Sequence, residues 1–235
     1  MATPAVIVFP LYPRITHLDF TGPHQVLSRL PGIETVVASV GGDPVDTDGF
    51  RFDGLSRLED VDHCDILCVP GGHGSIAALR DPAYMAAIRR LAASARYVTS
   101  VCTGSLILGA AGLLVGKRAA CHWAWRDLLA PLGAIPDPAR VVRDGNILTG
   151  GGVTAGIDFA FTLAAEIAGE EAAQALQLGL EYAPAPPFNA GSPDTAPGAV
   201  LELVRAANAA QQASRRAAID QAARALETNT LLQHP

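Results

Sequence analysis

Three short apolar runs constrain the fold of this chain more than any other feature of its sequence. They are Ala5-Val-Ile-Val-Phe9, Asp65-Ile-Leu-Cys-Val69 and Tyr97-Val-Thr-Ser-Val101. Continuous runs of this length, rich in β-branched residues, are typical of parallel strands that helices cover on both faces. Segments with helical spacing of apolar residues lie between them. The sequence therefore predicts an α/β fold with a doubly wound, mostly parallel central sheet.

The remaining segments fit the same alternation. A first helix is predicted to begin at Thr21-Gly-Pro23, where a cap precedes a proline in the first turn, and to end near Gly32. A long helix is predicted after Gly150-Gly-Gly152. The other predicted elements are strands over 34–40 and 118–121, a hairpin over 45–52, helices over 82–93, 104–111 and 123–129, and a β-pair over 141–149.

The chain divides into three predicted parts. Residues 1–181 form one α/β domain, and the proline-rich stretch 182–197 is an ordered or semi-rigid loop. Residues 198–228 are rich in alanine, glutamine and arginine with few large apolar side chains, which predicts a helix. We expect this C-terminal helix to pack on the domain or on a partner subunit.

Charge and cysteine content exclude several classes of protein. The 235 residues include 17 Lys+Arg and 23 Asp+Glu, for a formal net charge of -6, and no basic block suits nucleic acid. No signal peptide and no apolar run of about 18 residues is present, so we expect a cytoplasmic protein without a membrane segment. The four cysteines suit no disulfide framework, and Cys64 and Cys68 lack the spacing of a zinc site, so no metal is predicted.

The sharpest chemical signal is Cys102, which lies within Ser100-Val-Cys-Thr-Gly-Ser105 where a buried strand meets a helix. This context is typical of a nucleophile elbow, at the sheet edge where open α/β folds bind ligands. The helix N-terminus is expected to lower the pKa of the thiol. The alternative interpretation is a small buried apolar residue, and the local pattern alone does not decide between them.

Two further groups are predicted at the same edge. Asp19 follows the first strand in a mostly apolar setting; it is either a helix cap or, if buried beside a thiol, a carboxyl group with a raised pKa that donates a proton. Gly71 and Gly72 follow the third strand, where their amides suit a developing negative charge, and a tight turn is the simpler interpretation. His24, His73 and His122 are weaker candidates: pocket-wall or surface residues for the first two, a structural residue for the third.

These motifs carry a resemblance to a known family. Leu18-Asp-Phe-Thr-Gly-Pro23, Pro70-Gly-Gly72, Ser100-Val-Cys-Thr-Gly104 and Gly150-Gly-Gly-Val-Thr-Ala-Gly-Ile-Asp158 resemble the superfamily of Parkinsonism-associated deglycase, intracellular peptidase-like proteins and amidotransferase-like regulators. That resemblance covers residues 5 to about 180 and implies a flavodoxin-like three-layer sandwich. Within the superfamily, residues 95–105 and 180–197 are most similar to the isonitrile hydratases. Those enzymes resemble this chain in having Asp where much of the superfamily has Glu, and Thr at the position of Thr103.

The resemblance implies a cofactor-independent homodimer without metal that hydrates an isonitrile, R-N≡C, to an N-substituted formamide with water. In that hypothesis Cys102 attacks the terminal carbon, Asp19 delivers a proton, and water releases the product from a thioimidate. Thr103 positions the water or Asp19, and the amides of Gly72 and Thr103 line the site. Two alternatives remain: a ligand-binding amidotransferase-like regulatory module without a DNA-binding domain, and a glyoxalase- or deglycase-like stress protein.

Overall fold

The computed structural model describes residues 5–233, with side chains described through residue 228, and a seven-stranded sheet forms its centre. The strand order is β10-β11-β7-β6-β1-β2-β5, and every pairing is parallel except that of β10 with β11. The sheet strands are β1 (Ala5–Pro10), β2 (Ile33–Ser39), β5 (Ser56–Arg57), β6 (Ile66–Val69), β7 (Tyr97–Val101), β10 (Val141–Asp144) and β11 (Ile147–Gly150). The predicted flavodoxin-like α/β fold is confirmed.

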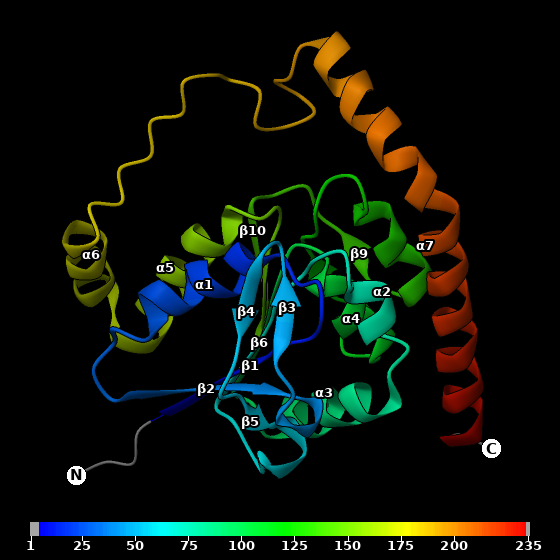
Figure 1. The fold of residues 1–235 in the computed structure, drawn as a ribbon, viewed down its shortest axis with the longest axis horizontal. Coiled ribbons are helices and arrows are strands. Elements are labelled where there is room, and N and C mark those ends of the chain that lie inside the picture. The colour runs from blue at the N-terminus through cyan, green and yellow to red at the C-terminus, as the bar shows by residue number, and fades with distance from the viewer. Residues whose placement is uncertain (1–4, 234–235) are drawn as a thin grey trace.

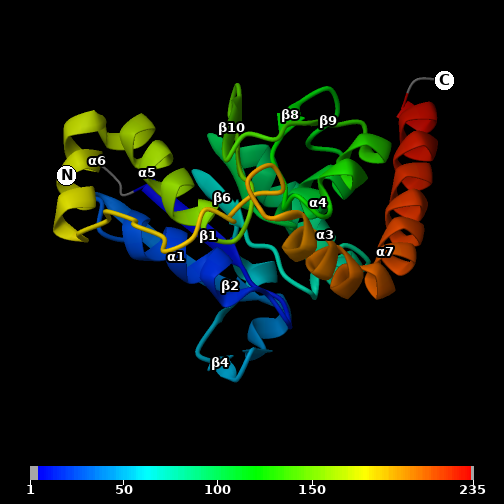
Figure 2. The same cartoon turned by 90° about the horizontal axis from the view of Figure 1, so that it is seen from above.

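Helices cover both faces of this sheet (Figures 1 and 2). Seen from above, α1 and α5 lie on one side of the strands, and α3 and α4 lie on the other (Figure 2). The helices are α1 (His17–Leu27), α2 (Ser75–Ala78), α3 (Pro82–Ser94), α4 (Gly104–Ala110), α5 (Ala155–Ala168), α6 (Glu170–Gly179) and α7 (Gly198–Gln233). Smaller elements are β3 (Val45–Thr47), β4 (Phe50–Phe52), β8 (Arg118–Ala119), β9 (Ile135–Pro136) and the 3-10 helices η1 (Val40–Gly42), η2 (Leu58–Asp60) and η3 (Arg126–Leu132).

The predicted central strands are buried as the sequence pattern requires. All residues of β6 and β7 are buried, and β1 is buried from Ile7 onward. Because helices cover both faces, side chains pointing either way enter the core. The parallel strands end at the same edge of the sheet, where β1, β6 and β7 continue into the loops that form the candidate site.

The prediction for the first helix was wrong at its N-terminus. α1 begins at His17, so Pro23 lies inside the helix and Asp19 lies in its first turn. The interior proline is accommodated where α1 crosses α5 closely. A Cβ atom on Gly156 of α5 would lie 3.3 Å from Pro23 Cδ, so the absence of a side chain there leaves room for the proline ring.

The helix predicted over 123–129 is replaced by the 3-10 helix η3, which begins later and contains Pro131. A proline interrupts regular α-helical hydrogen bonding, and short 3-10 turns tolerate it better. Gly133 ends η3 in the left-handed conformation, with φ of 80°. The sequence predictions did not include α2, β5 and β9, which are short, or α6, which spans ten residues.

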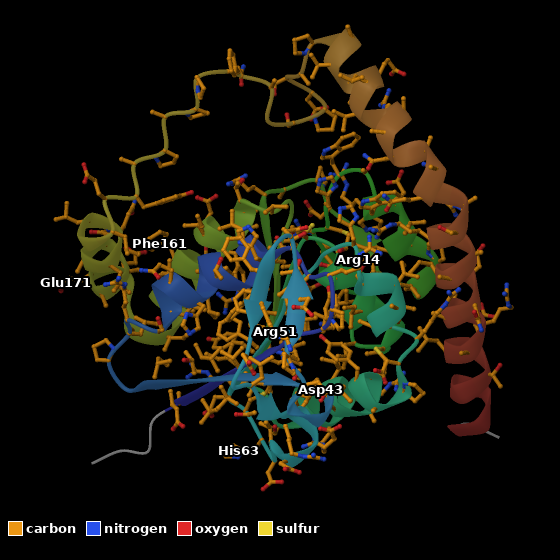
Figure 3. All side chains as sticks on the ribbon, in the orientation of Figure 1. Arg14, Asp43, Arg51, His63, Phe161 and Glu171 are labelled. Atoms are coloured by element: carbon orange, nitrogen blue, oxygen red, sulfur yellow. The ribbon has the colours of Figure 1, made fainter. Side chains whose placement is uncertain are left out.

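The C-terminal part of the chain leaves the α/β body and returns to it. Residues 183–191 are exposed, and this stretch arches above the body between α6 and α7 (Figures 1 and 3). α7 then runs along the side of the molecule, where it contacts η3 and α4. Among residues 5–233, none of the helices has the length and apolar character needed to cross a lipid bilayer.

Candidate active site

The backbone at Cys102 forms a sharp turn between β7 and α4. Cys102 has φ of 58°, in the left-handed region that non-glycine residues rarely adopt. Its N–H donates to the carbonyl oxygen of Gly150 at 3.0 Å, which fixes the turn against the end of β11. Gly104 allows the close approach that follows, because a Cβ atom there would lie 2.3 Å from Val69 O. The predicted strand-turn-helix context of Cys102 is therefore present.

Asp19 reaches the same place from the first turn of α1. Its side chain is fully buried, and its Oδ2 accepts a hydrogen bond of 3.1 Å from the Gly71 N–H. Its Oδ1 is buried and has no hydrogen-bond partner among the described side-chain and backbone N and O atoms. The Cys102 thiol lies close enough to hydrogen-bond this carboxyl group, an interaction that lowers the pKa of Asp19. Asp19 is thus held through Oδ2 by the Gly71 amide, while its Oδ1 makes no hydrogen bond to a described N or O atom.

Thr103 and Gly72 hold each other by two hydrogen bonds. The Thr103 hydroxyl accepts from the Gly72 N–H at 2.9 Å and donates to the Gly72 carbonyl oxygen at 3.2 Å. The amides of both predicted glycines therefore donate to protein side chains: Gly71 N–H to Asp19 and Gly72 N–H to Thr103. A direct contact of either amide with substrate stays a prediction, and their visible role is to position the two side chains.

Neither glycine could carry a side chain in this arrangement. A Cβ atom on Gly71 would lie 2.5 Å from Thr103 N and 2.8 Å from Asp19 Oδ2. On Gly72, whose φ is 140°, it would lie 2.4 Å from Thr16 N. The loop after β6 is therefore pressed directly against the elbow and against α1.

Burial controls the ionisation of the two reactive groups. It raises the pKa of Asp19 from 3.8 to about 7, while the contact with Cys102 and the Gly71 amide lower it in part. Burial also raises the pKa of the Cys102 thiol well above 9.0, and the Asp19 carboxylate raises it further. The expected lowering by the helix N-terminus exists, because the Thr103 amide favours the thiolate, but burial outweighs it. The sequence-based expectation of a lowered thiol pKa was wrong for this reason.

Tyr12, which is not among the predicted catalytic residues, belongs to the same buried region. Its hydroxyl donates to Pro70 O at 2.8 Å, which ties the segment after β1 to the loop after β6. Burial, followed by the charges of Tyr84, Asp19 and Cys102, raises the pKa of the Tyr12 hydroxyl well above 10.0. Its position directly after a predicted strand was the only signal in the sequence.

The weaker histidine candidates lie in different surroundings. His24 packs against the rings of Phe9 and Phe20, and His73 is exposed. His122 stacks on Trp123 with ring centroids 5.7 Å apart, and burial followed by the charge of Arg215 lowers the pKa of this histidine. No described contact joins any of the three to Cys102.

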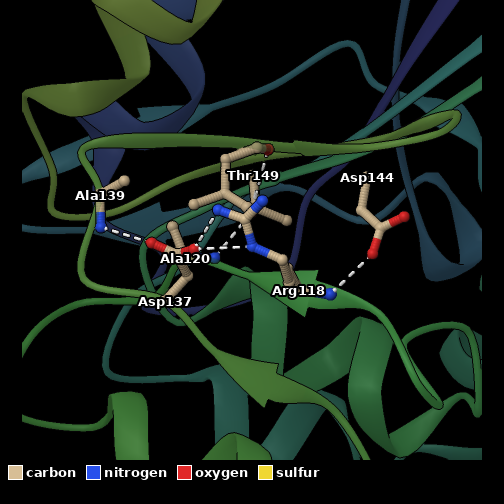
Figure 4. A network of polar contacts seen from close by, with 7 residues as sticks. Arg118, Ala120, Asp137, Ala139, Asp144 and Thr149 are labelled. Atoms are coloured by element: carbon tan, nitrogen blue, oxygen red, sulfur yellow. Dashed lines mark hydrogen bonds and ion pairs between the residues drawn. The ribbon is translucent and has the colours of Figure 1, made fainter.

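Further polar contacts, between residues that do not include Cys102 or Asp19, hold the backbone around the elbow. The Ser105 hydroxyl, in the first turn of α4, lies 2.9 Å from Ser100 Oγ and donates to Ala120 O at 2.6 Å. The Ala120 N–H in turn donates to Thr149 Oγ1 at 2.8 Å, as Figure 4 shows. The ion pair between Arg118 and Asp137 holds the same segment at the surface. These contacts link α4, β7 and β11 around the turn at Cys102.

The described residues contain no cluster of three or more His, Cys, Asp or Glu side chains that could hold a metal ion. All four cysteines are free thiols. Burial raises the pKa values of Cys64, Cys68 and Cys121 to about 12. Cys102 differs from the other three in its contact with a buried carboxyl group.

Comparison with known proteins places the chain in a family. The model of the DJ-1/PfpI family matches residues 5–166. The chain is 55% identical over 200 residues to isonitrile hydratase from Pseudomonas putida, covering 85% of this chain and 88% of that protein. The crystal structure of a THiJ/PfpI family protein from Pseudomonas syringae superposes with a TM-score of 0.88 at 41% identity, covering 94% of this chain and 90% of the other. Drosophila melanogaster DJ-1beta superposes with a TM-score of 0.69 at 26% identity, covering 77% of this chain and all of the other (100%). With the family model matching well over half of its length, and with this elbow and this sheet, the chain belongs to the DJ-1/PfpI family.

Proposed function

We propose that this protein is an isonitrile hydratase that converts R-N≡C and water to an N-substituted formamide. The observation that carries the proposal is the contact between the Cys102 thiol and a fully buried Asp19 carboxyl group with one unpartnered oxygen. The similarity to the Pseudomonas putida isonitrile hydratase supports it. An isonitrile carbon must accept a nucleophile and a proton at the same atom, and a thiol beside a carboxylate supplies both.

The first half of the reaction adds the thiol across the isonitrile carbon. Asp19, as carboxylate, takes the proton of Cys102 while the sulfur forms a bond to the terminal carbon. The carboxylic acid then returns that proton to the same carbon. The product is a thioimidate, R-N=CH-S-Cys102, and Asp19 is again a carboxylate.

The second half consumes water. Asp19 takes a proton from a water molecule as the water oxygen attacks the thioimidate carbon, and the carboxylic acid so formed passes that proton to the nitrogen. The carbon-sulfur bond of the resulting adduct, R-NH-CH(OH)-S-Cys102, breaks as its hydroxyl proton is transferred through Asp19 to the sulfur, giving R-NH-CHO and the Cys102 thiol. Thr103, fixed by its two hydrogen bonds to Gly72, keeps the loop after β6 in contact with the elbow throughout.

The test is direct incubation of the purified protein with cyclohexyl isonitrile, followed by detection of the formamide by chromatography and mass spectrometry. We expect the native protein to form one formamide for each isonitrile consumed, over many turnovers, and Cys102→Ala to form none. Methylglyoxal is the competing substrate in the same assay. Consumption of methylglyoxal without formation of formamide would refute the proposal in favour of a glyoxalase-like activity.

We also expect a cytoplasmic homodimer, as the family resemblance implies. Exposed apolar side chains support self-association, since Leu178 of α6 and Phe188 in the following loop are 83% and 79% exposed. Light scattering coupled to size-exclusion chromatography measures the molar mass directly. A monomeric mass at micromolar concentration would contradict the expectation.

A further inference from the structure

The C-terminal helix α7 carries one charged side chain into the interior, Arg215. This side chain is 4% exposed, whereas its neighbour Arg216 lies on the exposed face of the same helix. Among the described residues, no carboxylate forms an ion pair with the Arg215 guanidinium. An unpaired buried cation is costly, so its presence calls for a compensating anion or a strong polar environment.

The neighbours of Arg215 offer only partial compensation. Its guanidinium lies over the ring of Trp125 at 4.4 Å from the centroid. Its remaining contacts are long hydrogen bonds to Gln211 Oε1 at 3.3 and 3.4 Å and to Ser75 Oγ at 3.5 Å. None of these partners carries a negative charge.

The contact with Ser75 points toward the candidate active site. Ser75 begins α2, and its N–H donates to the carbonyl oxygen of Gly72 at 3.2 Å. Gly72 is the residue that clasps the Thr103 hydroxyl beside Cys102. Arg215 therefore lies against the outer side of the loop whose inner side holds the elbow.

Four ionisable groups interact electrostatically with Arg215. They are Tyr12 after β1, Cys102 at the elbow, and Cys121 and His122 before η3. Arg126 contributes a second positive charge at Cys121, and Asp19 contributes the negative charge that faces Cys102. Burial lowers the pKa of Arg215, and the charges of Cys102, Cys121 and Tyr12 oppose that shift.

We propose that Arg215 is a positioning residue of the active site, and that its guanidinium stabilises the negative charge on Cys102 when the thiol gives up its proton. The inference rests on the proposed function only for the identity of the reaction. The physical claim, that a helix outside the α/β domain supplies the cation for the elbow thiol, concerns the thiol alone. Of the groups around it, Cys102 is the one whose contact with a carboxyl group provides a route for its proton.

The experiment measures alkylation of Cys102 by iodoacetamide in the full-length protein, because the rate reports the thiolate fraction without using an isonitrile. Peptide mass spectrometry separates Cys102 from the other three thiols. Arg215→Met keeps an apolar stem over Trp125 and removes the charge. We expect its Cys102 to react about tenfold more slowly at pH 8, as a thiol pKa raised by about one unit would produce.

Matched variants separate charge from structure. Arg216→Met removes a charge from the exposed face of the same helix, and we expect it to react like the native protein. Arg215→Lys keeps the charge and should recover most of the native rate. A merely structural role predicts the opposite sign, because looser packing exposes the buried thiol and speeds its alkylation.

Arg215→Gln, which retains a polar group toward Ser75, serves as the second neutral variant. If either folded neutral variant alkylates at the native rate or faster, the proposal is wrong. If both neutral variants fail to fold while Arg215→Lys folds, the charge serves stability rather than the thiol, and the proposal is equally overturned. A protein that forms no formamide but shows the Arg215 effect on alkylation would refute the proposed function and leave this inference standing.

Discussion

The backbone N–H of Gly71 donates a 3.1 Å hydrogen bond to Oδ2 of Asp19, and Oδ1 of that buried carboxyl group is left unpartnered. This hydrogen bond ties the Asp19 side chain, which comes from the first turn of α1, to the loop that follows β6. The carboxyl group keeps a raised pKa because the hydrogen bonds with the Cys102 thiol and the Gly71 amide offset only part of the cost of burial.

Activity should fall as the pH drops below about 7. The pair formed by Asp19 and Cys102 is reactive when it holds one proton. That proton can lie on the sulfur or on the carboxylate oxygen, and the total number of protons on the pair, which sets the pH dependence of the rate, is the same in both cases. Protonation of Asp19, with its pKa of about 7, gives a pair with two protons and removes the base. We expect kcat/KM to fall tenfold per pH unit on the acid side. A flat profile between pH 5.5 and 8 would contradict this assignment.

Asp19→Asn should inactivate the enzyme and stabilise the fold at alkaline pH. Because the folded-state pKa is raised from 3.8 to about 7, the folded protein holds a proton that the unfolded chain releases. The free energy of unfolding therefore decreases as the pH rises from about 4 to about 7, by a few kcal/mol in total. Asparagine has no such penalty and can still accept from Gly71.

The measurement for Asp19→Asn is thermal unfolding of the native protein and the variant at pH 4.5 and pH 8. The variant should gain melting temperature relative to the native protein at pH 8 and gain less at pH 4.5. Its rate of isonitrile hydration should fall by at least about a hundredfold, the usual scale for loss of a general acid-base group. Native kinetics in this variant would remove Asp19 from the mechanism.

Gly71→Ala should cost activity far more than an ordinary glycine substitution. The added Cβ would meet Thr103 N at 2.5 Å and Asp19 Oδ2 at 2.8 Å, so the loop, the elbow or α1 must shift. We expect a fall in kcat of at least about tenfold, because a displacement of about 1 Å from the reactive geometry can lower the rate about a hundredfold. Gly179→Ala is the matched control, since a Cβ there meets nothing within 4 Å. Equal activity of the two variants would show that the loop yields freely.

Thr103→Val tests the clasp with Gly72. Valine has nearly the same shape but leaves the Gly72 N–H, now bonded at 2.9 Å, without an acceptor in the interior. An unsatisfied buried donor costs about 1–3 kcal/mol, which chemical denaturation measures as a lowered free energy of unfolding. Thr103→Ser keeps the hydroxyl and should lose less than half as much. If serine and valine are equally destabilising, the lost methyl packing or a change in the elbow matters more than the hydrogen bonds.

Much of this architecture could be read from the order of residues. The apolar runs that became β1, β6 and β7 are recognisable because strands covered on both faces must be apolar throughout. Cys102 was recognisable because a buried strand, a glycine two residues later and a helix are adjacent in the chain. Asp19, Gly71 and Thr103 were assigned to one edge of the sheet because parallel strands end on the same side.

Tertiary structure decided the rest, because burial and long-range contact are not local properties of a sequence. α1 begins at His17 without a side-chain cap at Thr16, and its interior Pro23 is accommodated by the close crossing with Gly156 of α5, which no local pattern reports. The thiol pKa is raised rather than lowered because desolvation at Cys102 exceeds the local effect of the helix N-terminus. The amides of Gly71 and Gly72 serve Asp19 and Thr103, a pairing set by how three loops pack. The sequence therefore predicted which residue types lie at the candidate site. Their charge states and hydrogen-bond partners depend on how deeply the fold buries them and on which loops it brings together.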